Sequence, residues 1–192
     1  MFSSAAYYGR ELTAAEVPRV QALFEANPEY FLATNGRAPR PNEAQAEFDD
    51  LPPGHLAFTK RWFVGLFDRH HDLIGVAVVV SDLCAAHVWH IALFLVATRL
   101  HGQGVAHEIF GALETWMRDA GAQWLRLGVV AGSARAARFW TRHGFREVRI
   151  RTGVDTGGPL NDIRVLVEPL EDRDVVEYLA SVPRDQPGST LA

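Results

Sequence analysis

Three observations predict that the chain folds as a single α/β domain. Apolar runs of strand length alternate along the sequence with segments whose apolar residues recur at helical spacing. A length of 192 residues with 48% hydrophobic content is enough to bury one core without disulfides or metals. The one cysteine, Cys84, excludes an internal disulfide, and its apolar context indicates a packing residue.

The N-terminal part predicts a short strand followed by a helix. The strand extends from Tyr7 to Leu12. Thr13 stands three residues before Glu16, which is the spacing of a capping box at a helix start. That helix continues to about Ala26, where Asn27-Pro28 ends it.

A second helix is predicted from Asn42 to Leu51, after a turn-rich stretch at 35–41. This helix carries carboxylates at Glu43, Glu47, Asp49 and Asp50. They form either a solvated helix face, which is the preferred interpretation, or an acidic rim that attracts a cationic substrate.

Two β-rich runs, Arg61 to Phe67 and Leu73 to Val80, are joined by a polar turn and predict a hairpin. His70 and His71 lie in that turn. We interpret them as exposed turn residues because a metal site would need partners that the sequence does not supply. No metal is expected.

A glycine-bearing turn joins the next strand, Val88 to Val96, to a helix from Ala106 to Ala120. Gly102 and Gly104 lack a Cβ, so an anion can approach the main chain and a positive φ is allowed. The free N–H groups of the first helical turn would then face that anion. Taken alone, the turn is equally consistent with an ordinary strand-to-helix connection.

The rest of the chain predicts one more strand, a short helix, two strands and an extension. The strand from Trp124 to Val130 is interpreted as central because only Arg126 interrupts its apolar run. Ser133 is a plausible N-cap of the short helix, and Gly144 terminates it. The later segments are strands at Phe145–Arg151 and Ile163–Val167 with a loop at Gly153–Asn161, a short helix at Asp172–Ala180 and a frayed tail at Pro183–Ala192.

Two motifs stand out in this order of elements: the turn from His101 to Ala106 and, later, the residues Ala136, Phe139, Gly144 and Phe145. Together they resemble the GNAT superfamily of acyl-CoA-dependent N-acetyltransferases. The family's cofactor motif is Gln or Arg, two residues, Gly, one residue, then Gly or Ala. Its later helix typically reads N-x-x-A-x-x-F-Y-x-x-x-G-F. The resemblance is clearest from Ala57 to Val167, and the matching positions are the turn His101-Gly102-Gln103-Gly104-Val105-Ala106 and the residues Ala136, Phe139, Gly144 and Phe145.

The resemblance implies a mixed, mostly antiparallel central sheet of about six or seven strands with helices on both faces. It implies a single acetyltransferase domain at 1–168 and a C-terminal extension at 169–192. The strands Val88–Val96 and Trp124–Val130 are expected to splay apart. Backbone groups near Phe94, Leu95 and Val96 would then be free to pair with the pantetheine arm of acetyl-CoA.

Two registers fit the cofactor motif. The register from Arg99 to Gly104 satisfies it literally, whereas that from His101 to Ala106 aligns better with the flanking strand and helix and is preferred. In both, main-chain amides hold the CoA pyrophosphate, and each helix-terminus contact contributes roughly 0.3–1 kcal/mol. The cofactor-binding residues implied are Phe94, Leu95, Val96, His101, Gly102, Gln103, Gly104, Val105, Ala106, Ser133, Phe139 and Trp140.

The sequence departs from the family's catalytic pattern. Ala92 stands where many members carry glutamate, Trp140 where many carry an acidic tyrosine, and Ser133 where asparagine is usual. An alkyl ammonium of pKa about 10.4 must lose a proton before attack, at a cost of about 4–5 kcal/mol at pH 7. His90 is the remaining candidate base, or equally a packed strand histidine. Tyr30 is expected to line the acceptor pocket rather than to act as an acid.

The function predicted is acetyl transfer from acetyl-CoA to a primary amine of a small molecule or peptide, by direct attack in a ternary complex. The alternative is an acyl-CoA-binding or regulatory module on the same fold, as the missing glutamate and tyrosine suggest. An α/β nucleotide binder would need an acidic residue after the next strand, and Val130 to Ser133 offers none. The segment from Tyr30 to Leu51 is expected to build the acceptor pocket and favours a cationic amine.

Composition and charge limit the expected partners. A net charge of −4 argues against nucleic-acid binding, which needs a basic face. No apolar run approaches the roughly 20 residues of a membrane span. Met1 to Gly9 lacks the features of a signal peptide. We therefore expect a cytoplasmic protein with no nucleic-acid or membrane partner, and a homodimer is plausible for this family.

Overall fold

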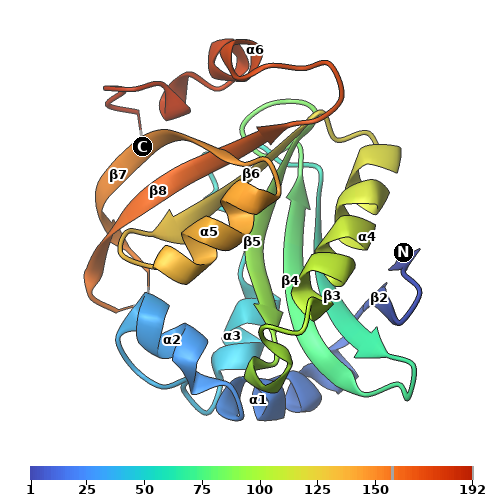
Figure 1. The fold of residues 1–192 in the computed structure, drawn as a ribbon. Helices are drawn as coiled ribbons and strands as arrows, with labels where there is room; N and C mark the ends of the chain where they lie inside the picture. Colours follow the sequence, from blue (N-terminus) through green and yellow to red (C-terminus); the bar gives the residue numbers. More distant parts are fainter. Residues whose placement is uncertain (157, 192) are drawn as a thin grey trace.

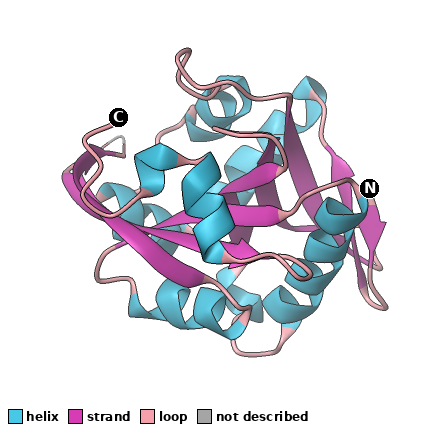
Figure 2. Cartoon of the chain, turned by 90° about the horizontal axis from the view of Figure 1, so that it is seen from above, coloured by secondary structure: helices cyan, strands magenta, loops and turns pink. Residues whose placement is uncertain are grey.

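The computed structural model of the chain describes residues 1–156 and 158–191. Eight strands form one sheet in the order β1-β2-β3-β4-β5-β6-β8-β7, and helices cover both of its faces (Figures 1 and 2). The β5–β6 pair is parallel and the other pairs are antiparallel. The strands are β1 Phe2–Ser3, β2 Tyr7–Glu11, β3 Lys60–Asp68, β4 Leu73–Ser81, β5 Val88–Val96, β6 Trp124–Val130, β7 Arg146–Asp155 and β8 Leu160–Pro169.

Apart from α2, the α-helices occur along the chain in the predicted order. The 3-10 turns are η1 Ala14–Glu16, η2 Thr98–Leu100 and η3 Pro183–Asp185. The α-helices are α1 Val17–Glu25, α2 Pro28–Asn35, α3 Glu43–Asp49, α4 Val105–Asp119, α5 Ala134–Arg142 and α6 Val175–Ser181. The mixed, mostly antiparallel sheet with helices on both faces is therefore confirmed. It has eight strands rather than six or seven because β1, at two residues, is too short to leave a pattern.

Three apolar clusters fill the space between the layers. On one face of the sheet, α4 and α5 pack through residues such as Phe110 and Trp140. On the other face, α1 packs through Val20 and Phe24 against β4 and the end of β5. A third cluster, centred on Tyr178, lies under the C-terminal segment. The sheet is thus covered on both faces, as the apolar β-strands require.

Helix α2 was not predicted from the sequence. Pro28 was interpreted as the end of the preceding helix, but it stands in the first turn of α2, where its missing N–H costs nothing. Phe31 is the one residue of α2 that is buried, so the segment carries no apolar stripe. Without that stripe, periodicity could not reveal the helix.

The C-terminal tail is packed, and the prediction of a frayed tail is wrong as far as Ser189. Asp185 is fully buried, and the guanidinium of Arg149 donates to the carbonyls of Arg184 and Ser189. The packing of the tail could not be predicted from the spacing of apolar residues, because polar contacts hold it. Ala192 lies outside the described residues, and the division of the chain at residue 168 stays a prediction.

Strands β7 and β8 are longer than predicted. The predicted loop from Gly153 to Asn161 is reduced to residues 156–159, of which Gly157 lies outside the described residues. At the two strand ends the ladder pairs Val154 with Asn161 and Asp155 with Leu160, so each pair joins one apolar and one polar residue.

Candidate active site

Strand β5 carries a bulge at its centre. Two consecutive residues of β4 pair with Leu93 and Ile91, which leaves Ala92 as an extra residue. The bulge reverses the alternation of side chains along the strand. Before it Ile91 packs on the α4 side, and after it Leu93 packs on the α1 side.

Beyond the bulge, β5 and β6 diverge (Figure 1). Their parallel pairing ends at Ile91 and Leu127. We call the opening beyond these residues the splay. Ala92 and Gly128 border it, and both are exposed although they belong to interior strands. The predicted splay is confirmed, and it leaves the β6 side of residues 92–96 without a strand partner among the described residues.

The glycine turn lies at the end of β5, next to the splay. Gly102 and Gly104 have φ of +79° and +81°, and a Cβ added at either would meet no atom within 4 Å. Gly104 is the N-cap of α4, and no side chain caps the helix start. The first amides of α4 have no intrahelical acceptor, so the turn is open to an anion and can accommodate a pyrophosphate.

His101 ties the turn to the strand that precedes it. Its Nε2 donates to the Val96 carbonyl oxygen at 2.7 Å. Nδ1 is buried and has no hydrogen-bond partner within residues 1–156 and 158–191. His101 therefore braces the turn instead of extending into solvent. The Val96 carbonyl, expected to be free for the pantetheine arm, already accepts this bond.

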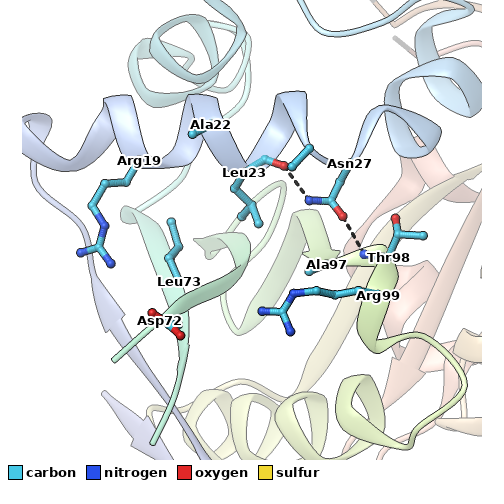
Figure 3. A pocket seen from close by; sticks show the side chains of 10 residues that line it. Arg19, Ala22, Leu23, Asn27, Asp72, Leu73, Ala97, Thr98 and Arg99 are labelled. Carbon is cyan, nitrogen blue, oxygen red and sulfur yellow. Dashed lines mark hydrogen bonds between the residues drawn. The ribbon is translucent and has the colours of Figure 1, made fainter. Parts of the chain in front are cut away.

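Asn27 fixes the far side of the turn to α1. Its Oδ1 accepts from the amide of Thr98 at 2.6 Å, and its Nδ2 donates to the Leu23 carbonyl at 2.7 Å (Figure 3). A groove of about 480 Å³ lies beside this link, between α1, the start of β4 and η2. Arg19, Arg99 and Asp72 are the charged residues that line it, so Arg99 of the literal motif register faces this groove (Figure 3).

An aromatic cluster supports the splay from the α5 side. The Phe94 ring stacks on Phe139 at 5.9 Å between centroids and meets Trp140 edge-on at 5.7 Å. Trp140 is only 7% exposed and belongs to the core. Ser133 stands at the N-cap of α5, but its side chain makes no capping hydrogen bond. Among these predicted cofactor residues, Trp140 acts as packing beneath the site.

His90 is a packed strand residue. Its Nδ1 lies 3.1 Å from the Arg126 carbonyl oxygen and 3.3 Å from Arg126 Nη1. Burial, followed by the Arg126 charge, lowers the pKa of His90 to about 3. Taking a proton from an ammonium of pKa about 10.4 would then cost roughly 10 kcal/mol, more than releasing it to water at pH 7. The geometry thus favours the structural alternative over the base.

Tyr30 and Glu47 lie close together between α2 and α3. Tyr30 is half-buried and meets Phe31 edge-on, and burial, followed by the Glu47 charge, raises the pKa of its phenol. Burial also raises the pKa of Glu47 to about 7, although Arg61 lies 3.4 Å away. A phenol that holds its proton this firmly suits a pocket wall better than an acid.

Two of the carboxylates of α3 pair with arginines. Glu43 pairs with Arg37 at 2.9 Å and with Arg40 at 3.0 Å. Glu47 pairs with Arg61. These pairs reduce the negative field of the predicted acidic rim, to which the exposed Asp49 and Asp50 still contribute, so the basis for a cationic amine is weakened.

Helix α2 also closes one side of the site against the β7–β8 connection. The Thr34 carbonyl accepts from Thr156 Oγ1 at 3.1 Å and from Asn161 Nδ2 at 2.9 Å. Segments far apart in sequence thus meet beside Tyr30 of the same helix.

Sequence reasoning did not single out Gly128 or Asp185. A Cβ at Gly128 would lie 2.9 Å from Ile163 Cγ2, and a glycine inside an apolar strand is a recognisable sign of such close approach. Asp185 forms a buried ion pair with Arg126 at 2.6 Å. An isolated acidic residue in a polar tail gives no comparable signal.

Two further features concern the described chain, residues 1–156 and 158–191. It contains no group of three or more His, Cys, Asp or Glu arranged to hold a metal ion. None of its helices combines the length and apolar character that crossing a bilayer requires.

Comparison with known proteins agrees with this geometry. Residues 20–145 match the model of the acetyltransferase (GNAT) family. No curated protein sequence matches the chain.

Solved structures share the fold at low sequence identity. An acetyltransferase from Thermus thermophilus is 20% identical, with a TM-score of 0.67 over 88% of this chain and 100% of that one. A GCN5-related N-acetyltransferase from Kribbella flavida is 22% identical, with a TM-score of 0.62 over 86% and 98%. A spermidine N-acetyltransferase from Vibrio cholerae, in complex with CoA and spermine, is 12% identical, with a TM-score of 0.64 over 85% and 95%.

Proposed function

Because the chain belongs to the GNAT family of acetyltransferases, we propose that it transfers an acetyl group from acetyl-CoA to a primary amine of a small molecule or peptide. The observation that carries the proposal is the splay beside the open glycine turn. An opening in the middle of a sheet exposes main-chain polar groups, which is costly unless a ligand or water pairs with them.

The residues around the splay fit acetyl-CoA as a co-substrate. Main-chain amides from Gln103 to Ala106 would hold the pyrophosphate, with Gly102 and Gly104 giving it access. Phe94 and Leu95 would pair with the pantetheine arm through their backbone. Ser133 and Phe139, at the start and middle of α5, would border the arm on the other side.

The reaction proposed is direct attack in a ternary complex. The neutral amine forms a bond to the thioester carbonyl carbon, and the carbon–sulfur bond then breaks. Unpaired N–H groups of β5 near the bulge are the donors available to the developing oxyanion. The amine loses its proton to solvent, and the departing thiolate takes one from solvent. Catalysis then rests on positioning, which can supply several kcal/mol.

A second candidate function is a module that binds acyl-CoA without transferring the acyl group. The absence of a side-chain base at Ala92 and the buried indole of Trp140 favour it. Turnover is the property that separates the two functions.

Two measurements test the proposal. Isothermal titration calorimetry should show saturable binding of acetyl-CoA, with CoA as a competitor, and an absence of binding would refute both functions. Release of free CoA across a panel of amines, measured with a thiol reagent, should then show transfer. Binding without release to any acceptor would identify the non-catalytic module.

The remaining properties are proposed from the sequence. A cytoplasmic location, a homodimeric state and the absence of nucleic-acid and membrane partners follow from composition and family resemblance. Light scattering on the purified protein determines the oligomeric state directly.

A further inference from the structure

Four arginines gather on the sheet face that the C-terminal segment partly covers. Arg126 comes from β6, Arg149 and Arg151 from β7, and Arg184 from η3. The ladder places the strand members on one face. Arg126 pairs with Val167 and Arg149 with Val165, two positions apart on β8.

Gly128, which borders the splay, lies on the same face of the sheet as these arginines. Gly128 of β6 also pairs with Val165, and its missing Cβ would point at Ile163 Cγ2. Arg151 pairs with Ile163 on the other side of β8. The Arg151 side chain and the exposed Gly128 therefore share one face, with only β8 between them.

One carboxylate in this cluster is already used. Asp185 accepts from Arg126 Nε at 2.6 Å and from Arg126 Nη2 at 3.1 Å, and it also accepts from the hydroxyl of Tyr178. The guanidinium of Arg149 donates hydrogen bonds to the backbone carbonyls of Arg184 and Ser189. The charge of Asp185 also acts on Arg151 and Arg184, but no hydrogen bond joins its carboxylate to either of them within residues 1–156 and 158–191.

Two guanidinium groups of this cluster, those of Arg151 and Arg184, lie within the field of the Asp185 charge but form no ion pair with it among the described residues. Within residues 1–156 and 158–191, Arg151 makes no hydrogen bond or ion pair. Among the residues that the structure describes, Arg184 Nε is buried without a hydrogen-bond partner, and its Nη1 donates to Cys84 Sγ at 3.5 Å. Burial, followed by the charges of Arg184, Arg126 and Arg149, lowers the pKa of Arg151, and the charge of Asp185 only partly offsets this. Cations that repel one another in a partly buried place are stabilised when an anion joins them.

Resting on the proposed function, we infer that Arg151 and Arg184 bind a carboxylate of the acceptor, so that the acceptor is an amine carrying a carboxylate, such as a free α-amino acid. A guanidinium offers paired donors that match a carboxylate. On α3, by contrast, Glu43 and Glu47 are already paired with arginines. This substrate class differs from the cationic amine that the sequence favours.

The test compares matched acceptors at saturating acetyl-CoA. L-phenylalanine, its amide and 2-phenylethylamine share a side chain, as do L-leucine, its amide and isopentylamine. For at least one set, kcat/KM for the amino acid should exceed that for the amide and the amine by at least about tenfold, the effect of a hydrogen bond to a charged group. The amide is the stricter comparison because its amine is less basic and therefore more often neutral. Equal or faster transfer to the amides and amines would overturn the inference while leaving the acetyltransferase intact.

Variants locate the effect. Arg151→Gln and Arg184→Gln should raise KM for the amino acid at least about tenfold, with KM for acetyl-CoA and the melting temperature unchanged. Arg142→Gln is the matched control, since Arg142 is exposed on α5, which packs on the opposite face. A selectivity unchanged in both site variants, or a loss of acetyl-CoA affinity instead, would contradict the inference.

A binding measurement keeps the inference testable if no acceptor releases CoA. Calorimetry with the CoA-saturated protein compares N-acetyl-L-phenylalanine with N-(2-phenylethyl)acetamide. Binding of the acid alone, weakened by Arg151→Gln, supports the carboxylate site even if the transferase proposal fails. Absence of binding by the acid, or equal binding of both compounds, overturns it.

Discussion

Arg126 and Asp185, 59 positions apart in sequence, form a buried ion pair with two hydrogen bonds of 2.6 and 3.1 Å. The pair fastens the C-terminal segment to β6, and Tyr178 adds its hydroxyl to the same carboxylate. Burial alone would raise the pKa of Asp185, but the hydrogen bonds and charge of Arg126 lower it instead. The C-terminal segment is therefore part of the folded unit.

Asp185→Asn should destabilise the protein strongly. The substitution leaves the Arg126 charge buried without its counterion, which typically costs about 3–5 kcal/mol of the free energy of unfolding. Urea denaturation followed by fluorescence measures it, with Glu171→Gln on the exposed surface as a control. A loss below about 1 kcal/mol, the range of ordinary surface substitutions, would mean that the pair does not hold the segment.

Glu168 should make the protein less stable as the pH rises. Burial, followed by the charge of Glu114, raises the pKa of Glu168 to about 8, and its Oε2 has no hydrogen-bond partner among the described residues. The folded protein therefore binds this proton more tightly than the unfolded chain does. Its contribution to stability is complete below 4.5, the ordinary pKa of a glutamate side chain, and is lost as the pH rises towards about 8.

Glu168→Gln tests this dependence directly. The variant should melt above the wild type at pH 9 and close to it at pH 4.5, because glutamine carries no charge to bury. Glu47 titrates over part of the same range, so the informative quantity is the difference between variant and wild type at each pH. A difference that does not change with pH would contradict the assignment to Glu168.

Gly104→Glu should abolish acetyl-CoA binding. Its carboxylate would occupy the space in front of the free amides of α4 and repel the pyrophosphate. Gly121→Glu is a matched control at the other end of α4. It too has a positive φ, +104°, and open space around its added Cβ, so it reproduces the backbone strain without the site. Calorimetry should show binding only in the control, and equal affinity in the two variants would remove the turn from the site.

The order of elements could be predicted from the sequence because it rests on local periodicity. Strands β5 and β6 have the predicted bounds, and the helix after the glycine turn begins one residue earlier than expected. The splay was expected from the family resemblance alone. Its physical cause, the bulge at Ala92, depends on the register with β4 and leaves no local sequence pattern.

Side-chain roles could be predicted less well, because they depend on contacts across the fold. The sequence leaves His90 equally open as a base or a packed strand residue, and its contacts with Arg126 on β6 favour the packed role. The sequence does not show which arginines pair with Glu43 and Glu47, because these partners are brought close only by the fold. Arg151 and Arg184 lie 33 positions apart, and no sequence pattern links them. They come close together only because β7 and the packed C-terminal segment lie side by side in the fold.

A crystal structure of the protein with acetyl-CoA tests the central claim most directly. The account predicts the pyrophosphate against the main-chain amides of Gln103 to Ala106 and the pantetheine arm inside the splay. The acetyl carbonyl should then lie at the bulge beside Ala92. Acetyl-CoA bound outside the splay, with β5 and β6 unoccupied between Ala92 and Gly128, would contradict it.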